Sequence, residues 1–166
     1  MKAMIQLLFI LLISLAGCGS TGTVVMKITD LPAEDVTKAE VTLSQVRVHS
    51  TGVGNETEAG WSTVNEGPVT FDLVQLRNNV TALLGQTELT PGKYTQIRLS
   101  VDGASATIAG EEVELTIPSN EIKLVHPFDI VAGETVTLVL DWDVAEAIHQ
   151  AGNTYIMRPT IKIMQE

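Results

Sequence analysis

Short runs of alternating apolar and polar residues, separated by turn residues, constrain the fold of this chain more than any other feature. Alternation with a period of two is typical of a strand that buries one face. Roughly eight or nine such runs at regular spacing, with almost no helical pattern, predict an all-β fold, an antiparallel β-sandwich with one or two short helical connections. The runs are 23–29, 39–49, 61–64, 68–76, 95–101, a hairpin around 109–111 within 105–117, 121–130, 134–143 and 154–163.

Three segments depart from simple alternation. Within 39–49 the buried parity changes between Leu43 and Val46, which predicts a β-bulge at Ser44-Gln45. The apolar residues of 76–85 fall at helical spacing and predict a turn of helix. The segment 144–152 predicts a second short helical connection, ended by Gly152.

The N-terminal segment has the pattern of an export signal. Lys2 precedes an apolar run that is too short to span a bilayer comfortably but is typical of a signal sequence. Leu15-Ala16-Gly17-Cys18 resembles the lipobox of prokaryotic lipoproteins, which implies a diacylglycerol thioether on Cys18 as the mature N-terminus. An ordinary secretory signal beside a chance cysteine is the alternative. We therefore predict a signal peptide at 1–17, a lipidated tether at 18–22 and a single sandwich domain at 23–166.

The lone cysteine and the acidic charge favour attachment through lipid. Cys18 is the only cysteine, so no internal disulfide can form, and acylation would remove an exposed thiol. Ten basic and twenty acidic residues give a net charge of −10, which repels nucleic acid and anionic headgroups. We expect no nucleic-acid partner. The expected location is the cell envelope, on the outer side of the cytoplasmic membrane or on the outer membrane, beside an envelope protein partner.

Residues with catalytic or metal-binding potential form no recognised motif. The three histidines lack metal-ligand spacing, and no G-x-S-x-G sequence occurs, so we predict no enzyme activity and no cofactor. Asp141 and Asp143 alternate with core residues on one strand and are the candidates for a calcium site, since calcium takes carboxylate oxygens. Trp61 and Trp142 are both predicted to pack in the core.

Two sequons provide candidate modification sites. Asn55-Glu-Thr and Asn79-Val-Thr fit the pattern for N-glycosylation. Asn55 falls in a polar loop, where an acceptor would be accessible in a glycosylating host.

Several segments together resemble the domain-of-unknown-function 4382 family of prokaryotic envelope proteins. They are TDLPA, VTFDLVQL, LTPGKYTQIRLSV, KLVHPFDI and LVLDWDVAEAIHQAGNTYIMRPTI, in that order. The resemblance implies an all-β sandwich of prealbumin-like or immunoglobulin-like kind. It implies no activity and no functional residues.

These features predict a lipid-anchored, non-enzymatic envelope lipoprotein that serves as a binding or accessory module. A calcium- or polysaccharide-binding surface module is the alternative.

Overall fold

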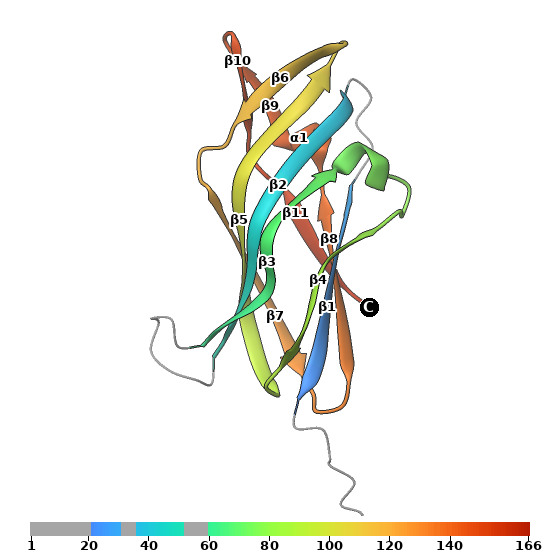
Figure 1. Cartoon of the computed structure of the whole chain (residues 1–166), viewed down its shortest axis with the longest axis vertical. Helices are drawn as coiled ribbons and strands as arrows, with labels where there is room; N and C mark the ends of the chain where they lie inside the picture. Colours follow the sequence, from blue (N-terminus) through green and yellow to red (C-terminus); the bar gives the residue numbers. More distant parts are fainter. Residues whose placement is uncertain (1–20, 31–35, 52–59) are drawn as a thin grey trace, which may run out of the picture.

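Two β-sheets packed face to face form an elongated sandwich (Figure 1). The computed structural model describes residues 21–30, 36–51 and 60–166. Its strands are β1 (Gly22–Asp30), β2 (Val36–Ser50), β3 (Trp61–Asp72), β4 (Ala82–Leu89), β5 (Gly92–Ile108), β6 (Glu111–Thr116), β7 (Glu121–Ile130), β8 (Thr135–Trp142), β9 (Ile148–Ala151), β10 (Thr154–Met157) and β11 (Ile161–Gln165). Two single-turn helices, η1 (Leu73–Leu76) and α1 (Val144–Ala147), complete the described elements.

The sheets differ in size and in connection. The smaller has the order β11-β8-β1-β4, and the larger has the order β3-β2-β5-β6-β10-β9. The long strand β5 pairs with β6 along its C-terminal part and with β7 along its N-terminal part. β7 and β6 therefore follow one another along the same edge of β5.

The core consists of the inward-facing residues of both sheets. Alternate residues of β1, β2, β5 and β8 are almost completely buried, and Trp142 is the largest of them. Each such side chain stabilises the fold by roughly 1.5–3 kcal/mol on burial. The all-β sandwich is confirmed, and Trp142 lies in the core as predicted.

Two local predictions hold at the residue level. The registers of β2 with both β3 and β5 shift between Leu43 and Gln45, which confirms the bulge. Because of this shift, Leu43 and Val46 are both buried despite their opposite parity. The hairpin between β5 and β6 turns at Ala109 and Gly110, whose φ angles of 50° and 86° are typical of a two-residue hairpin turn.

The strand pairing is mixed and not uniformly antiparallel. Seven of the nine described strand pairs are antiparallel, whereas β1 pairs with β8 and β6 pairs with β10 in parallel. Parallel neighbours need a long crossover connection, and β1 and β8 are separated by most of the chain. Alternation cannot reveal such a distant pairing.

The helical prediction for 76–85 is wrong. Asn78 and Asn79 adopt left-handed φ angles of 59° and 65°, and the following residues form β4, an edge strand paired with β1. The apparent helical period was misleading because Val80 and Leu83, although apolar, are 51% and 59% exposed. Their spacing therefore does not mark a buried face. Helical structure occurs earlier, in η1, where the Asp72 carboxylate accepts a hydrogen bond from the Val74 amide at 3.2 Å.

The C-terminal segments are also more divided than predicted. Of 144–152, only Val144–Ala147 is helical; residues 148–151 form β9, and Gly152 lies in the turn to β10 with a φ of 64°. The single strand predicted at 154–163 is two strands, β10 and β11, which belong to different sheets. Pro159, which has no amide hydrogen to donate, lies between them.

Candidate functional site

Three cationic side chains form a row across the outer face of the larger sheet. Arg47 on β2 lies directly opposite Arg98 on β5, which in turn lies directly opposite Lys123 on β7. Like charges directly opposite each other destabilise a sheet, by a few tenths of a kcal/mol to about 1 kcal/mol for each pair. These three residues are a substantial share of the ten lysines and arginines in a chain with a net charge of −10. Core packing does not require this arrangement, so it marks a candidate site.

Trp61 organises the side chains around this row. The guanidinium carbons of Arg98 and Arg47 lie 4.5 and 5.3 Å from its ring centroid, and the His49 ring centroid lies at 4.8 Å. Cation–π contacts of this kind contribute about 0.5–1 kcal/mol at exposed positions. Trp61 was predicted to pack in the core; this prediction is wrong, since Trp61 lies on the outer face beside His49.

One carboxylate partly neutralises the row. Glu121 Oε1 lies 3.0 Å from Arg98 Nη1, and Glu121 Oε2 lies 3.5 Å from Arg47 Nη2. Among the described residues Lys123 has no ion-pair partner, so the row keeps a positive excess. The Trp61 cluster comprises Arg47, His49, Trp61, Gln96, Arg98, Glu121 and Lys123.

The Trp61 cluster surrounds a small cavity. Its volume is about 120 Å³, and it is lined by His49, Trp61, Gln96, Arg98 and Lys123. Among the residues that the structure describes, Nε of both arginines, His49 Nδ1 and Gln96 Oε1 are buried without a hydrogen-bond partner. Buried polar atoms normally have partners, and leaving one unsatisfied costs about 1–3 kcal/mol. The site therefore retains hydrogen-bonding capacity that a ligand, with a small movement of the side chains, would satisfy.

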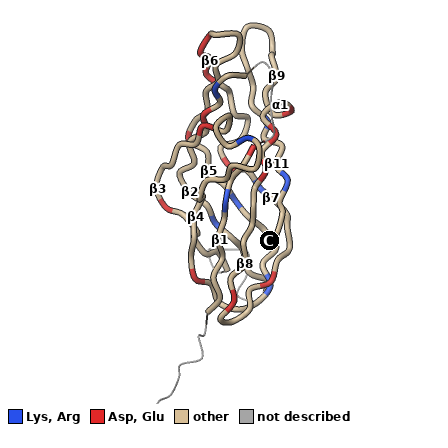
Figure 2. The backbone as a smooth tube through the Cα atoms, turned by 90° about the vertical axis from the view of Figure 1, so that its right-hand side faces the viewer, with Lys and Arg blue, Asp and Glu red and all other residues tan. Residues whose placement is uncertain are grey.

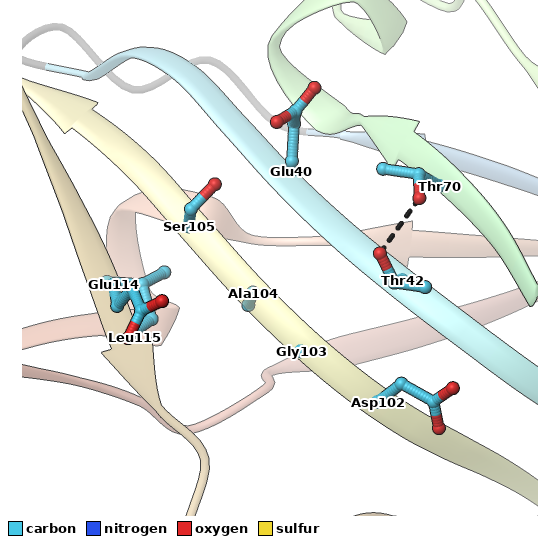
Figure 3. A pocket seen from close by; sticks show the side chains of 9 residues that line it. All are labelled: Glu40, Thr42, Thr70, Asp102, Gly103, Ala104, Ser105, Glu114 and Leu115. Atoms are coloured by element: carbon cyan, nitrogen blue, oxygen red, sulfur yellow. Dashed lines mark hydrogen bonds between the residues drawn. The ribbon is translucent and has the colours of Figure 1, made fainter.

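A second hollow of about 540 Å³ lies on the same outer face (Figure 3). Its polar groups come from Glu40, Thr42, Thr70, Asp102, Ser105 and Glu114. The hydroxyls of Thr42 and Thr70 point toward each other at 2.8 Å, and the small residues of 103–105 leave the space open. The bulge in β2 brings Glu40 and Arg47, seven positions apart and of opposite parity, to the same face. Glu40 and Arg47 are thus roughly 23 Å apart along β2, whereas Asp102 of the acidic hollow is four residues, or roughly 13 Å, from Arg98 along β5.

A third cavity, of about 450 Å³, contains a buried carboxylate. Asp30 is 3% exposed; its Oδ1 accepts a hydrogen bond from the Val144 amide at 3.1 Å, and its Oδ2 lies 3.5 Å from Arg77 Nε. Burial raises the pKa of Asp30 to about 6, against the opposing effects of the Val144 amide and the Arg77 charge. Asp30 connects the end of β1 to the start of α1, which is a structural role.

The predicted calcium ligands lie at the same end of the smaller sheet. Asp141 is on β8 and lines the third cavity, and burial raises its pKa with a smaller contribution from Asp143. Asp143 Oδ1 accepts a hydrogen bond from the Glu146 amide at 3.0 Å and caps α1. Within residues 21–30, 36–51 and 60–166, no group of three or more histidine, cysteine or acidic side chains has metal-binding geometry. Calcium binding stays a prediction.

The other predicted site residues have different outcomes. Asn79 is exposed in the turn before β4, where a glycosylation acceptor would be accessible. Leu15, Ala16, Gly17, Cys18 and Asn55 lie outside the described residues. No helix in the described part of the chain is long and apolar enough to cross a membrane.

Sequence reasoning missed the Trp61 cluster because its members are dispersed. Arg47, Arg98 and Lys123 belong to three strands and form no local motif. A partial signal was available: each alternates with buried or partly buried apolar residues, and this alternation places each of the three on an outer face. Their adjacency depends on the register of three strands.

The fold and the site together define a two-sheet, all-β domain whose larger sheet has a polar outer face with a cationic cluster and an acidic hollow. The chain belongs to the family of the domain of unknown function DUF4382, whose model matches residues 21–159. No curated protein and no solved structure is significantly similar to the chain.

Proposed function

We propose that this protein is a non-enzymatic binding module of the prokaryotic cell envelope, held at a membrane by lipid on Cys18. Its binding surface is the outer face of the larger sheet. The observation that carries the proposal is the Trp61 cluster, which places three cations in adjacent register at a cost in stability. A ligand or partner with an anionic group would relieve that repulsion.

The start of the described chain supports a position close to the membrane. The Thr21 carbonyl accepts a hydrogen bond from the Gly133 amide at 2.9 Å, and the Thr21 hydroxyl donates to Glu88 at 2.9 Å. Only two residues, 19 and 20, then separate the lipidated Cys18 from Thr21. Fully extended, the chain from Cys18 to Thr21 spans roughly 10 Å. The lower end of the sandwich, where β1 begins, would then face the membrane (Figure 1). The outer face of the larger sheet would be a side of the domain, not the surface that faces the membrane.

Site-specific photocrosslinking in native membranes tests the binding face. A photoreactive residue replaces Val125, which is 72% exposed and lies in register with Gln96 on the outer face. The matched control replaces Leu83, which is 59% exposed on the smaller sheet. We expect a recurrent adduct from position 125 and none from position 83. Equal labelling from both positions, or none from position 125, would contradict the proposal.

Intact mass spectrometry of the membrane-extracted protein tests the anchor. A chain that begins at Cys18 and carries the mass of a diacylglycerol group is the expected result. A chain that still begins at Met1 without lipid would refute the anchor while leaving the binding face open to the crosslinking test.

A further inference from the structure

We propose that the ligand of the Trp61 cluster is an acidic polysaccharide, bound through the carboxylate of a uronic-acid unit. This inference rests on the proposed binding function and specifies its ligand. Three features of the cluster favour this ligand: its charge, the geometry around Glu121 and its position along the sheet.

The charge of the cluster is opposite to that of its surroundings. Acidic residues are distributed over the whole length of the molecule (Figure 2), and the net charge is −10. At long range the protein therefore repels polyanions, and salt limits this repulsion to about 8–10 Å. Within that distance Lys123 and the two guanidiniums attract an anion directly. Such a site favours a polymer that carries separate acid groups. It disfavours a continuous anionic surface.

The arginines are already arranged around a carboxylate. Glu121 receives Arg98 on one oxygen at 3.0 Å and Arg47 on the other at 3.5 Å. Each guanidinium contributes one terminal nitrogen to Glu121, and both Nε–H groups have no hydrogen-bond partner among the described residues, so donors remain for a second acceptor. Lys123, opposite Arg98, lines the cavity without an ion-pair partner among the described residues. A second carboxylate, supplied by the ligand, fits between Lys123 and Arg98.

The lining of the cavity favours a sugar as the bearer of that carboxylate. A volume of about 120 Å³ admits one acid group and leaves the remainder of the ligand outside. The Trp61 ring already contacts the two guanidiniums and His49, so the exposed Val125, opposite Gln96, provides the free apolar surface beside the cavity. The Gln96 amide adds hydrogen-bonding groups. A pyranose ring has both apolar and hydroxyl-bearing faces, so it suits this combination of apolar and polar side chains.

The position of the cluster argues against lipid headgroups. Arg98 lies six residues beyond the start of β5 at the lower end of the sandwich, which corresponds to roughly 20 Å. This distance exceeds the Debye length in physiological salt, about 8 Å. A membrane that holds the lower end of the domain is therefore too distant to supply the anion.

Binding of the full-length, detergent-extracted protein to immobilised polygalacturonate tests the inference. Neutral dextran, dextran sulfate and vesicles with anionic phospholipid serve as comparison surfaces. Lys123→Gln and Arg98→Met remove charge at the cluster, while Lys162→Gln removes an exposed lysine from β11 on the other sheet. Losing a charged hydrogen bond weakens binding by about tenfold or more. We expect that loss for both cluster variants and wild-type binding for Lys162→Gln. The melting temperature should be unchanged in Lys162→Gln and equal or slightly higher in Lys123→Gln, because that variant removes the like-charge pair with Arg98.

Each alternative result overturns the inference. Equal binding to dextran sulfate would remove the specificity for carboxylates, and binding to vesicles alone would identify lipid as the ligand. Wild-type affinity in Lys123→Gln would show that polygalacturonate binds elsewhere. If polygalacturonate does not bind but position 125 still crosslinks in membranes, the binding function stands and only the polysaccharide ligand is wrong.

Discussion

The buried carboxylate of Asp30 predicts that this residue contributes more to the stability of the fold in mild acid than at neutral pH. Asp30 is 3% exposed, and burial raises its pKa from an ordinary value of 3.8 to about 6. Between these two values the folded state binds more protons than the unfolded state. The contribution of Asp30 to the free energy of unfolding is therefore fully present below pH 3.8, and it is lost as the pH rises through 6.

The size of the effect follows from the shift. About two pKa units at 1.36 kcal/mol each correspond to a loss of about 3 kcal/mol at neutral pH relative to strong acid. Between pH 4.5 and 7.5 the loss is about 2 kcal/mol, because at pH 4.5 part of the unfolded population has already ionised. A change of this size is a large fraction of the stability of an ordinary domain.

Urea unfolding of the wild type and of Asp30→Asn, at several pH values from 4.5 to 7.5, measures this effect. The variant keeps an oxygen that accepts from the Val144 amide but cannot ionise. We expect the wild type to lose about 2 kcal/mol relative to Asp30→Asn over this range. Asp102→Asn, at an exposed position on β5, is the control and should keep the wild-type pH dependence. A constant free-energy difference between wild type and Asp30→Asn would refute the reasoning.

Three further predictions concern packing and capping, each measured by denaturant unfolding. Gly85→Ala should destabilise the fold by about 1–3 kcal/mol, because the added Cβ would lie 2.7 Å from the Val64 carbonyl oxygen. In the control Gly103→Ala the added Cβ has no atom within 4 Å, so the free energy of unfolding should change by less than about 0.5 kcal/mol. Trp142→Ala should cost about 3–5 kcal/mol, since Trp142 is completely buried; a loss below about 1 kcal/mol would contradict its role in the core. Asp143→Ala should cost about 1 kcal/mol through the lost cap of α1, and an unchanged unfolding midpoint would show that this cap is dispensable.

Local patterns in the sequence identified most of the strands and which of their residues face inward, but they missed β4 and β9, which had been assigned to helical segments. The parity change between Leu43 and Val46 located the bulge, and Ala109-Gly110 located a hairpin turn. These features depend on neighbouring residues, since a strand buries alternate side chains whatever strand lies beside it. The same reasoning found Trp142 but misplaced Trp61, because an aromatic residue at the start of a strand can face either side.

Only the tertiary structure decided which strands are neighbours, and the candidate site depends on that. The parallel pairing of β1 with β8 and the row of Arg47, Arg98 and Lys123 both join segments far apart in the chain. The alternation of a single strand carries no information about its partner or register. The partner and the register of a strand depend on how the two sheets pack against each other and exclude water from one core. The sequence by itself thus determined the faces of the strands, and the packing of the sheets determined which charges meet on them.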